Sequence, residues 1–156
     1  IFWVIGLLVV VGILLVWGRM IIKSDYSSKS NRELALTCEP GGMAENYHIH
    51  PQLQIFINGT ESPLPKNIGV TTTCLHPIHT HEDIPNIHVE APEKRDFILG
   101  DFFAVWKQPF SKDEILNYKA DSTHTITMTI NGQPVDTFEN TLLKDKDQIV
   151  ITYQQI

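Results

Sequence analysis

The chain has 156 residues, which is enough for one ordinary domain with an additional element. It carries 12 basic and 18 acidic residues, a formal net charge of −6, and this sign argues against nucleic acid as a partner, because nucleic-acid-binding surfaces are basic. With 42% apolar residues the composition is that of a folded protein, and two cysteines are too few for a disulfide-rich scaffold. The motifs GxGxxG, GxxxxGK[ST] and GxSxG are absent from the sequence, which leaves nucleotide binding and the commonest serine hydrolase design without support.

The N-terminal segment is predicted to be a membrane anchor. Its first 17 residues contain no charged residue, and Trp3 and Trp17 lie near the two ends, where indole rings favour the lipid interface. At about 1.5 Å per residue, residues 1–22 would form a helix of roughly 33 Å, enough to cross a bilayer core of about 30 Å. We therefore predict an uncleaved transmembrane helix in contact with the lipid bilayer. The alternative is a cleaved signal peptide, but no small-residue cleavage site follows the apolar run.

The orientation of this anchor has two interpretations. Arg19 and Lys23 follow the apolar run, and by themselves they would keep the C-terminal side in the cytoplasm. A possible cysteine pair argues for an oxidising compartment instead, and we predict that the rest of the chain is extracytoplasmic. Residues 23–46 are polar and contain Ser and Gly, which predicts a linker with one helical turn over 32–37.

The extracytoplasmic domain is predicted over residues 47–156 and starts with strands. Apolar residues alternate over 53–57, and Asn58-Gly59 then marks a hairpin whose returning arm, 61–70, has the prolines of an edge strand. A long loop covers 71–86, and a strand covers 87–91. Four further elements are predicted: a helix over 97–106 capped by Asp96, a short helix over 112–119 opened by a capping box of Ser111 and Glu114, a strand over 125–130 that turns at Asn131-Gly132, and a strand over 148–153.

These elements predict an α+β fold in which a small mixed sheet packs against one helix. The closing stretch, TMTINGQPV to QIVITY, resembles the last hairpin and strand of β-grasp (ubiquitin-like) domains. The residues predicted to form the core are Leu53, Ile55, Ile57, Phe102, Phe103, Trp106, Ile126, Met128, Ile130, Ile149 and Ile151.

The histidines are the most informative feature of the sequence. Six of the seven lie between residues 48 and 88, and the spacings H-x-H (twice) and H-x-E place pairs of side chains on the same face of an extended chain. Several such donors can converge on one metal centre at about 2.0–2.2 Å, and imidazole-rich sites suit zinc and copper. The predicted ligands of a copper or zinc ion are His48, His50, His79, His81 and His88, with His76 and Glu90 as a second rank.

Other roles stay open for some of these residues. His76 would hydrogen-bond backbone in a proline-bounded loop, and Glu90 would orient a histidine rather than bind the ion. His124 is isolated before a strand and is predicted to be structural. Glu82 and Asp83 are expected to lie in solvent.

Three segments, HIHPQLQIFING, LHPIHTHEDIPNIHVEA and FILGDFFAVW, together resemble an uncharacterised family of single-anchor extracytoplasmic proteins of archaea and bacteria. The family pattern runs H-x-H-x-x-L-x-I, G, L-H-T-H-D, I-H-V-E and F-x-L-G-x-F-F-x-x-W, and the resemblance covers roughly residues 48–106. This chain departs from it where Pro77-Ile78 interrupts the L-H-T-H-D block and where Glu82 replaces Asp. The resemblance implies an exported, anchored domain and no particular activity.

The two cysteines leave two chemical possibilities. Cys38 and Cys74 would form a disulfide in an oxidising compartment, and closing a loop of this size would contribute about 3–4 kcal/mol. Alternatively, Cys74 would offer a thiolate to a soft metal such as Cu(I).

We predict a membrane-anchored extracytoplasmic metal-binding domain, which would act as an accessory subunit of a membrane complex. One alternative is a metalloenzyme with Glu82, Asp83 or Glu90 as its general base, although the sequence has no HExxH motif. The other is a structural or interaction module whose histidines form a polar network or a pH-responsive surface.

Overall fold

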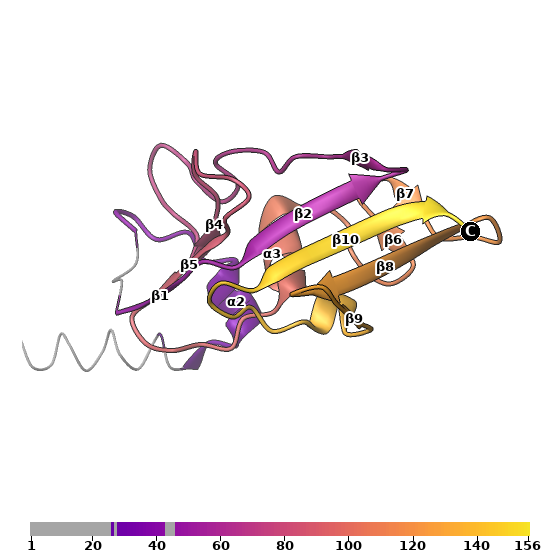
Figure 1. Cartoon of the computed structure of the whole chain (residues 1–156). Helices are drawn as coiled ribbons and strands as arrows, with labels where there is room; N and C mark the ends of the chain where they lie inside the picture. Colours follow the sequence, from indigo (N-terminus) through magenta and orange to yellow (C-terminus); the bar gives the residue numbers. More distant parts are fainter. Residues whose placement is uncertain (1–25, 27, 43–45) are drawn as a thin grey trace, which may run out of the picture. The chain divides into compact units, whose positions relative to one another are not determined.

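The computed structural model describes residues 26, 28–42 and 46–156 (Figure 1). The predicted anchor over 1–22 lies outside the described residues. Among the residues that are described, no helix has the length and apolarity needed to cross a bilayer. Asn31–Ile156 form one compact unit, called the body here. The body is α+β, as predicted.

The core of the body is built on a five-stranded mixed sheet of order β3-β2-β10-β8-β9. Its strands are β2 (Gln52–Ile57), β3 (Thr60–Glu61), β8 (His124–Ile130), β9 (Gln133–Val135) and β10 (Gln148–Gln155). The central strands β2 and β10 are parallel, and β8 is antiparallel to β10. Both predicted Asn-Gly turns are confirmed, because each pair has positive φ angles, 50° and 81° at Asn58-Gly59 and 52° and 78° at Asn131-Gly132.

A second, three-stranded sheet carries the histidines. It consists of β1 (Tyr47–Ile49), β5 (His88–Ala91) and β4 (Ile78–His79), in the order β1-β5-β4, with antiparallel pairing throughout. Strand β4 lies inside the segment predicted as a continuous loop, 71–86, so that prediction was incomplete. The register sets His48 opposite Glu90, about 40 residues away in the sequence, and His79 opposite His88, so that all three strands bring their polar side chains together.

The predicted helix over 97–106 is present as α3 (Leu99–Trp106), but its N-terminus differs from the prediction. The N–H of Leu99 donates to the carbonyl of Thr141 at 2.7 Å, and Ile98 pairs with Leu142, so the chain stays extended up to residue 98. Asp96 is therefore not the cap. The carboxylate of Asp101 accepts a hydrogen bond from the N–H of Ile98 at 2.9 Å and takes that role.

The predicted helix over 112–119 is wrong. These residues form a small hairpin of β6 (Glu114–Ile115) and β7 (Tyr118–Lys119), which turns at Leu116 with a φ of 54°. The Ser111 hydroxyl accepts a hydrogen bond from the N–H of Asp113 in a local turn and caps no helix. A helix this short is marginal without an apolar face, and Ile115 is the one buried side chain of the segment.

The segment predicted as a linker, 23–46, contains residues that pack into the body. Its predicted helical turn is α2 (Asn31–Ala35), in which Leu34 and Ala35 are buried. The Arg32 guanidinium lies 3.0 Å from the buried carboxylate of Asp101 and donates to the carbonyl of Gly100 at 2.7 Å, which fastens α2 to α3. The compact unit accordingly begins at Asn31.

The predicted core is mostly confirmed. Of the eleven residues, eight are buried, and Ile57, Trp106 and Ile130 are partly exposed. Figure 1 shows α3 lying across one face of the five-stranded sheet, where Phe102 and Phe103 are buried. The small sheet continues from one end of this core, because β1 leads into β2 through His50 and Pro51.

Candidate metal centre

His79, on strand β4, is the most deeply buried donor of the histidine cluster, with none of its side chain exposed. Its Nδ1 lies 2.9 Å from the backbone carbonyl of His76. A carbonyl can only accept, so Nδ1 carries the proton and Nε2 keeps a bare lone pair. Burial lowers the pKa of His79 from 6.5 to about 4, with the hydrogen bond to the His76 carbonyl acting in the opposite direction. The imidazole is therefore neutral at physiological pH and able to bind a metal ion.

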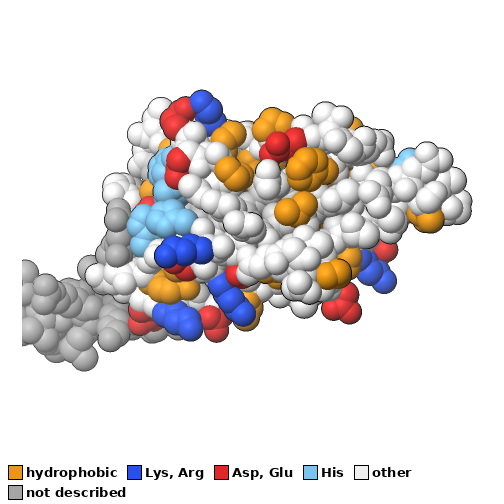
Figure 2. All heavy atoms as spheres, viewed as in Figure 1, with side chains coloured by type: hydrophobic (Ala, Val, Ile, Leu, Met, Phe, Trp, Pro, Cys, Tyr) orange, Lys and Arg blue, Asp and Glu red, His pale blue; other side chains and the backbone are white. Residues whose placement is uncertain are grey.

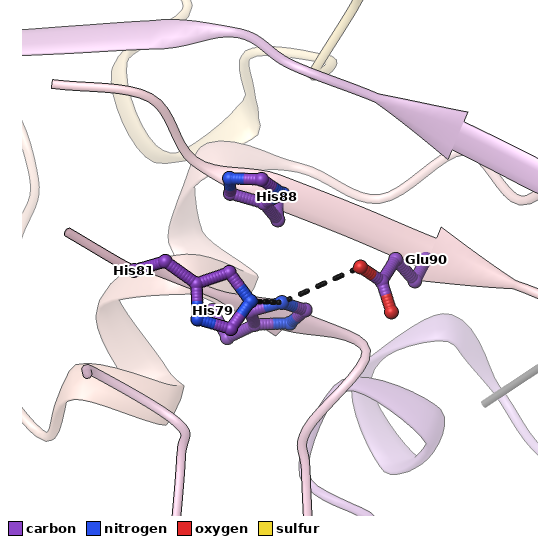
Figure 3. A group of neighbouring side chains, drawn as sticks. All are labelled: His79, His81, His88 and Glu90. Carbon is purple, nitrogen blue, oxygen red and sulfur yellow. Dashed lines mark hydrogen bonds and ion pairs between the residues drawn. The ribbon is translucent and has the colours of Figure 1, made fainter. Parts of the chain in front are cut away.

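The bare Nε2 of His79 faces two further donors (Figure 3). It lies 3.0 Å from Nε2 of His81 and 3.6 Å from Oε1 of Glu90. In a tetrahedral site with bonds of about 2.1 Å, neighbouring ligand atoms are about 3.4 Å apart, so these separations are those of ligands around one ion. We call His79, His81 and Glu90 the inner group.

Glu90 gives the inner group a negative charge in a buried place. Its side chain is 8% exposed, and within the described part of the chain the charged-group contacts of its carboxylate are with Nε2 of His48 at 3.3 Å and Nε2 of His79 at 3.6 Å, with no lysine or arginine. A lone pair on His79 and an anionic oxygen repel each other unless a proton or a cation lies between them. Burying such a carboxylate is costly without that partner.

His88, on β5, joins the inner group to the surface. Its Nε2 lies 3.1 Å from both carboxylate oxygens of Asp83, and its Nδ1 lies 3.3 Å from Nε2 of His48. A hydrogen bond from Nε2–H to Asp83 leaves Nδ1 as the nitrogen that can bind a metal. The pKa of Asp83 is lowered to about 2, mainly by the hydrogen bond from the Asn86 side chain and to a lesser extent by that from His88. This carboxylate is therefore ionised.

The role of Asp83 was missed in the sequence, where it was expected to lie in solvent. Its side chain is about half exposed yet contacts His88 directly. The sequence signal for this contact was that Asp83 precedes His88 by only five residues. The turn between them is held by a hydrogen bond from the Asn86 side chain to the Asp83 carboxylate at 3.0 Å. The neighbouring Glu82 follows the expectation, because it lies on the surface and pairs with Lys66.

His48 and His50 complete the cluster on its exposed side. As the i, i+2 spacing predicts, their rings lie together, with centroids 4.4 Å apart, and the His50 ring lies 4.6 Å from that of His88. We call His48, His50 and His88 the outer group. The pKa of His50 is lowered mainly by partial burial and, to a lesser extent, by the neighbouring His48 and His88. This favours the neutral, metal-binding form of His50. Figure 2 shows histidine side chains gathered on the surface at one end of the body.

The structure thus gathers six of the seven predicted site residues. The possible ligand atoms of His79, His81, His88 and Glu90 lie within 4.8 Å of one another, and so do those of His48, His50 and His88. These groups are able to hold a metal ion.

His76 is the predicted ligand that stays outside these groups. Its Nδ1 lies 3.0 Å from the carbonyl of Ala35, and its own carbonyl holds His79. His124, predicted to be structural, belongs to neither group of possible ligands and stacks on Tyr153 with a centroid distance of 5.0 Å. Cys74 is bonded to Cys38, so its thiolate is not a ligand.

Comparison of the chain with protein-family models, curated proteins and solved structures found no match. The geometry of the histidine cluster therefore carries the functional assignment.

Proposed function

We propose that this chain is a membrane-anchored extracytoplasmic protein that binds one copper or zinc ion in the histidine cluster. The observation that carries the proposal is the inner group, in which the bare Nε2 of buried His79 faces Nε2 of His81 and the carboxylate of Glu90. Nitrogen-rich sites with one carboxylate suit Zn²⁺ and Cu²⁺. With neutral imidazoles, Glu90 and Asp83 contribute two negative charges, which match the charge of one divalent ion.

The proposed location is supported by the cysteines and by the N-terminal sequence. Cys38 and Cys74 are paired across 36 residues with their Cα atoms 5.4 Å apart, and disulfides persist in oxidising compartments. The uncharged apolar run within residues 1–22 supports an anchor in the lipid bilayer. An accessory role beside a larger membrane complex is consistent with both features.

The strand order supports the β-grasp-like part of the proposal. In the five-stranded sheet, the hairpin β2-β3 precedes helix α3, the hairpin β8-β9 follows it, and the last strand, β10, lies parallel to β2 in the centre. In this arrangement the histidine-bearing sheet is an addition at one end of the β-grasp-like core, attached through β1. The core would then serve as a rigid support for the metal site.

Metal analysis of the purified chain tests the function. The 156-residue chain, carrying an affinity tag without histidine, would be purified in detergent, stripped with a chelator, and reloaded with Zn²⁺ or Cu²⁺ at about pH 7.5. We expect one ion per chain by elemental analysis and its loss in the double variant His79→Gln/His81→Gln. His124→Gln, the matched control, should keep the ion. Absence of bound metal in the wild type would contradict the proposal and favour the interaction module with a histidine network.

The topology needs a separate test. Protease added to intact spheroplasts should digest the body, since it is proposed to lie outside the membrane. Protection of the body until the cells are lysed would contradict the extracytoplasmic location without bearing on metal binding.

A further inference from the structure

We propose that the outer group is a transit position through which a single ion reaches and leaves the inner group. The cluster would then work as a two-step relay, suited to exchanging metal with another molecule rather than only retaining it. This inference rests on the proposed metal-binding function. It adds a route for the ion, which runs from the surface to the buried donors.

The exposure of the donors changes in steps across the cluster. The exposed fraction of the side chain is 0% for His79, 8% for Glu90, 12% for His88 and 29% for His48, and His81 is partly exposed. An ion arriving from water therefore meets the outer group before it reaches the buried donors His79 and Glu90. A buried position without such donors along its approach would force the ion to lose its water ligands before it gained protein ligands, which is costly for a divalent cation.

The donor atoms form a continuous series from one group to the other. Nε2 of His48 lies 3.3 Å from Nδ1 of His88 and 3.3 Å from Oε1 of Glu90. The same Oε1 lies 3.6 Å from Nε2 of His79. Donors separated by less than about 4.2 Å, twice the bond length of about 2.1 Å, can hold the same ion between them. An ion can therefore pass inward by exchanging one ligand at a time.

The ring of His88 makes the two positions mutually exclusive. His88 belongs to both groups of possible ligands, and its Nε2 is held by Asp83. Only Nδ1 remains for a metal, and one nitrogen lone pair binds one ion at a time. Two divalent ions would also bring four positive charges against the two negative charges of Glu90 and Asp83. The geometry therefore favours one ion with two alternative positions.

The experiment compares metal affinity with exchange rates in three matched variants of the full chain in detergent. His50→Gln alters the outer group alone, His81→Gln alters the inner group alone, and His124→Gln is the control. Zinc affinity is measured by competition with a chromophoric chelator, and zinc uptake and release by stopped flow.

We expect His50→Gln to slow uptake and release by about tenfold each, because a transit position lowers the barrier in both directions, and to weaken zinc affinity far less than His81→Gln does. His81→Gln should weaken zinc affinity by about 100-fold or more and speed release, because it removes a donor from the retained position. His124→Gln should match the wild type in affinity and in both rates.

Three results would overturn the relay and still leave metal binding by the histidine cluster in place. These are two zinc ions bound per chain, equal losses of affinity in His50→Gln and His81→Gln, and wild-type exchange rates in His50→Gln. They would show, respectively, two ions held together, one undivided site, or a route that bypasses the outer group. A wild-type chain that binds no zinc or copper would instead overturn the proposed function, and the relay with it.

Discussion

Asp83 orients His88 and is expected to tune the metal site without binding the ion. Asp83→Asn keeps the shape of the side chain and removes its charge, so the Nε2–H of His88 exchanges an anionic acceptor for a neutral amide. Because an amide can also donate, it no longer fixes the tautomer of the imidazole. We expect metal affinity to fall by about 10–100-fold, as for other carboxylates behind metal-binding histidines. The free energy of unfolding should change by less than about 1 kcal/mol, because the side chain is half exposed.

The adjacent Glu82 provides a matched control for this prediction. Glu82→Gln is the same change of carboxylate to amide, one residue away, on a side chain that pairs with Lys66 on the surface. Competitive zinc titration should give the wild-type affinity for Glu82→Gln. Equal affinities in the two variants would mean that Asp83 has no part in orienting His88.

The titration of His79 makes the metal-free body sensitive to acid. Because the folded pKa of His79, about 4, lies below its ordinary value of 6.5, the unfolded chain binds a proton in this window and the folded chain does not. The free energy of unfolding therefore falls as the pH drops from about 6.5 to about 4, by on the order of 3 kcal/mol from this residue. Urea unfolding in the presence of a chelator should show this loss in the wild type and a smaller one in His79→Gln. A loss of the same size in the variant would contradict the assignment.

Part of the site could be predicted from residue spacing alone. The pairs His48-x-His50 and His79-x-His81 converge because alternate residues of an extended chain point to the same face. The pairing of His48 with Glu90 depends on the register of β1 and β5, which are about 40 residues apart in the sequence, and no local signal gives it. The pairing of His79 with His88 depends on the register of β4 against β5 across a loop. His76 shows the limit of prediction from spacing. Its role is determined by a contact with the carbonyl of Ala35, which lies 41 residues away in the sequence.

At the scale of elements, the Asn-Gly dipeptides predicted turns correctly, whereas a capping box alone did not predict a helix correctly. Asn58-Gly59 and Asn131-Gly132 form turns because few other residues adopt two successive positive φ angles. The capping box at Ser111 and Glu114 predicted a helix, but the segment lacks an apolar face to stabilise one. Strand β4 escaped prediction because it has two residues and follows Pro77. Its pairing with β5 is a tertiary contact.

Gly100 in α3 is a position where close packing is expected to outweigh helix propensity in the effect of a substitution on stability. By propensity alone, Gly100→Ala would stabilise the helix by about 1 kcal/mol. A Cβ at this position would lie 2.9 Å from the carbonyl oxygen of Glu139 and 3.3 Å from a guanidinium nitrogen of Arg32. Relieving a backbone clash of this kind costs about 1–3 kcal/mol, so we expect the variant to be less stable than the wild type in urea unfolding.

A second variant in the same helix shows what propensity contributes there. Ala104→Gly should lower the free energy of unfolding by about 1 kcal/mol through helix propensity. If Gly100→Ala were instead more stable than the wild type, the segment of Glu139 would have moved aside, and the close contact with α3 would not be required for the fold.

At the scale of the whole molecule, the histidine sheet depends on connections to the core and to α2. Strand β1 continues into the central strand β2, and the N–H of Leu53 donates to the carbonyl of Pro85 at 3.1 Å. On the other side, Glu39 and Leu75 exchange two backbone hydrogen bonds of 3.0 Å next to the Cys38–Cys74 disulfide. The chain is thus fixed on both sides of β4, at Leu75 before it and at Pro85 after it.

Removing the disulfide should therefore affect both the folding free energy and the metal site. For Cys38→Ser/Cys74→Ser, the greater entropy of the unfolded chain should lower the free energy of unfolding by about 3–4 kcal/mol. That effect arises in the unfolded state and requires no change in the folded site. Metal affinity, in contrast, reports on the folded state. We expect zinc affinity to weaken by about tenfold, because the loop that presents the His76 carbonyl to His79 loses its covalent link to α2.

Urea unfolding of the metal-free chain and zinc competition measure the two effects separately. Reduction of the wild-type disulfide provides an independent version of the same change and should reproduce the loss of free energy of unfolding. Wild-type zinc affinity in the double serine variant would mean that noncovalent contacts, such as that of Arg32 with Asp101, suffice to position β4. The disulfide would then stabilise the fold as a whole without shaping the metal site.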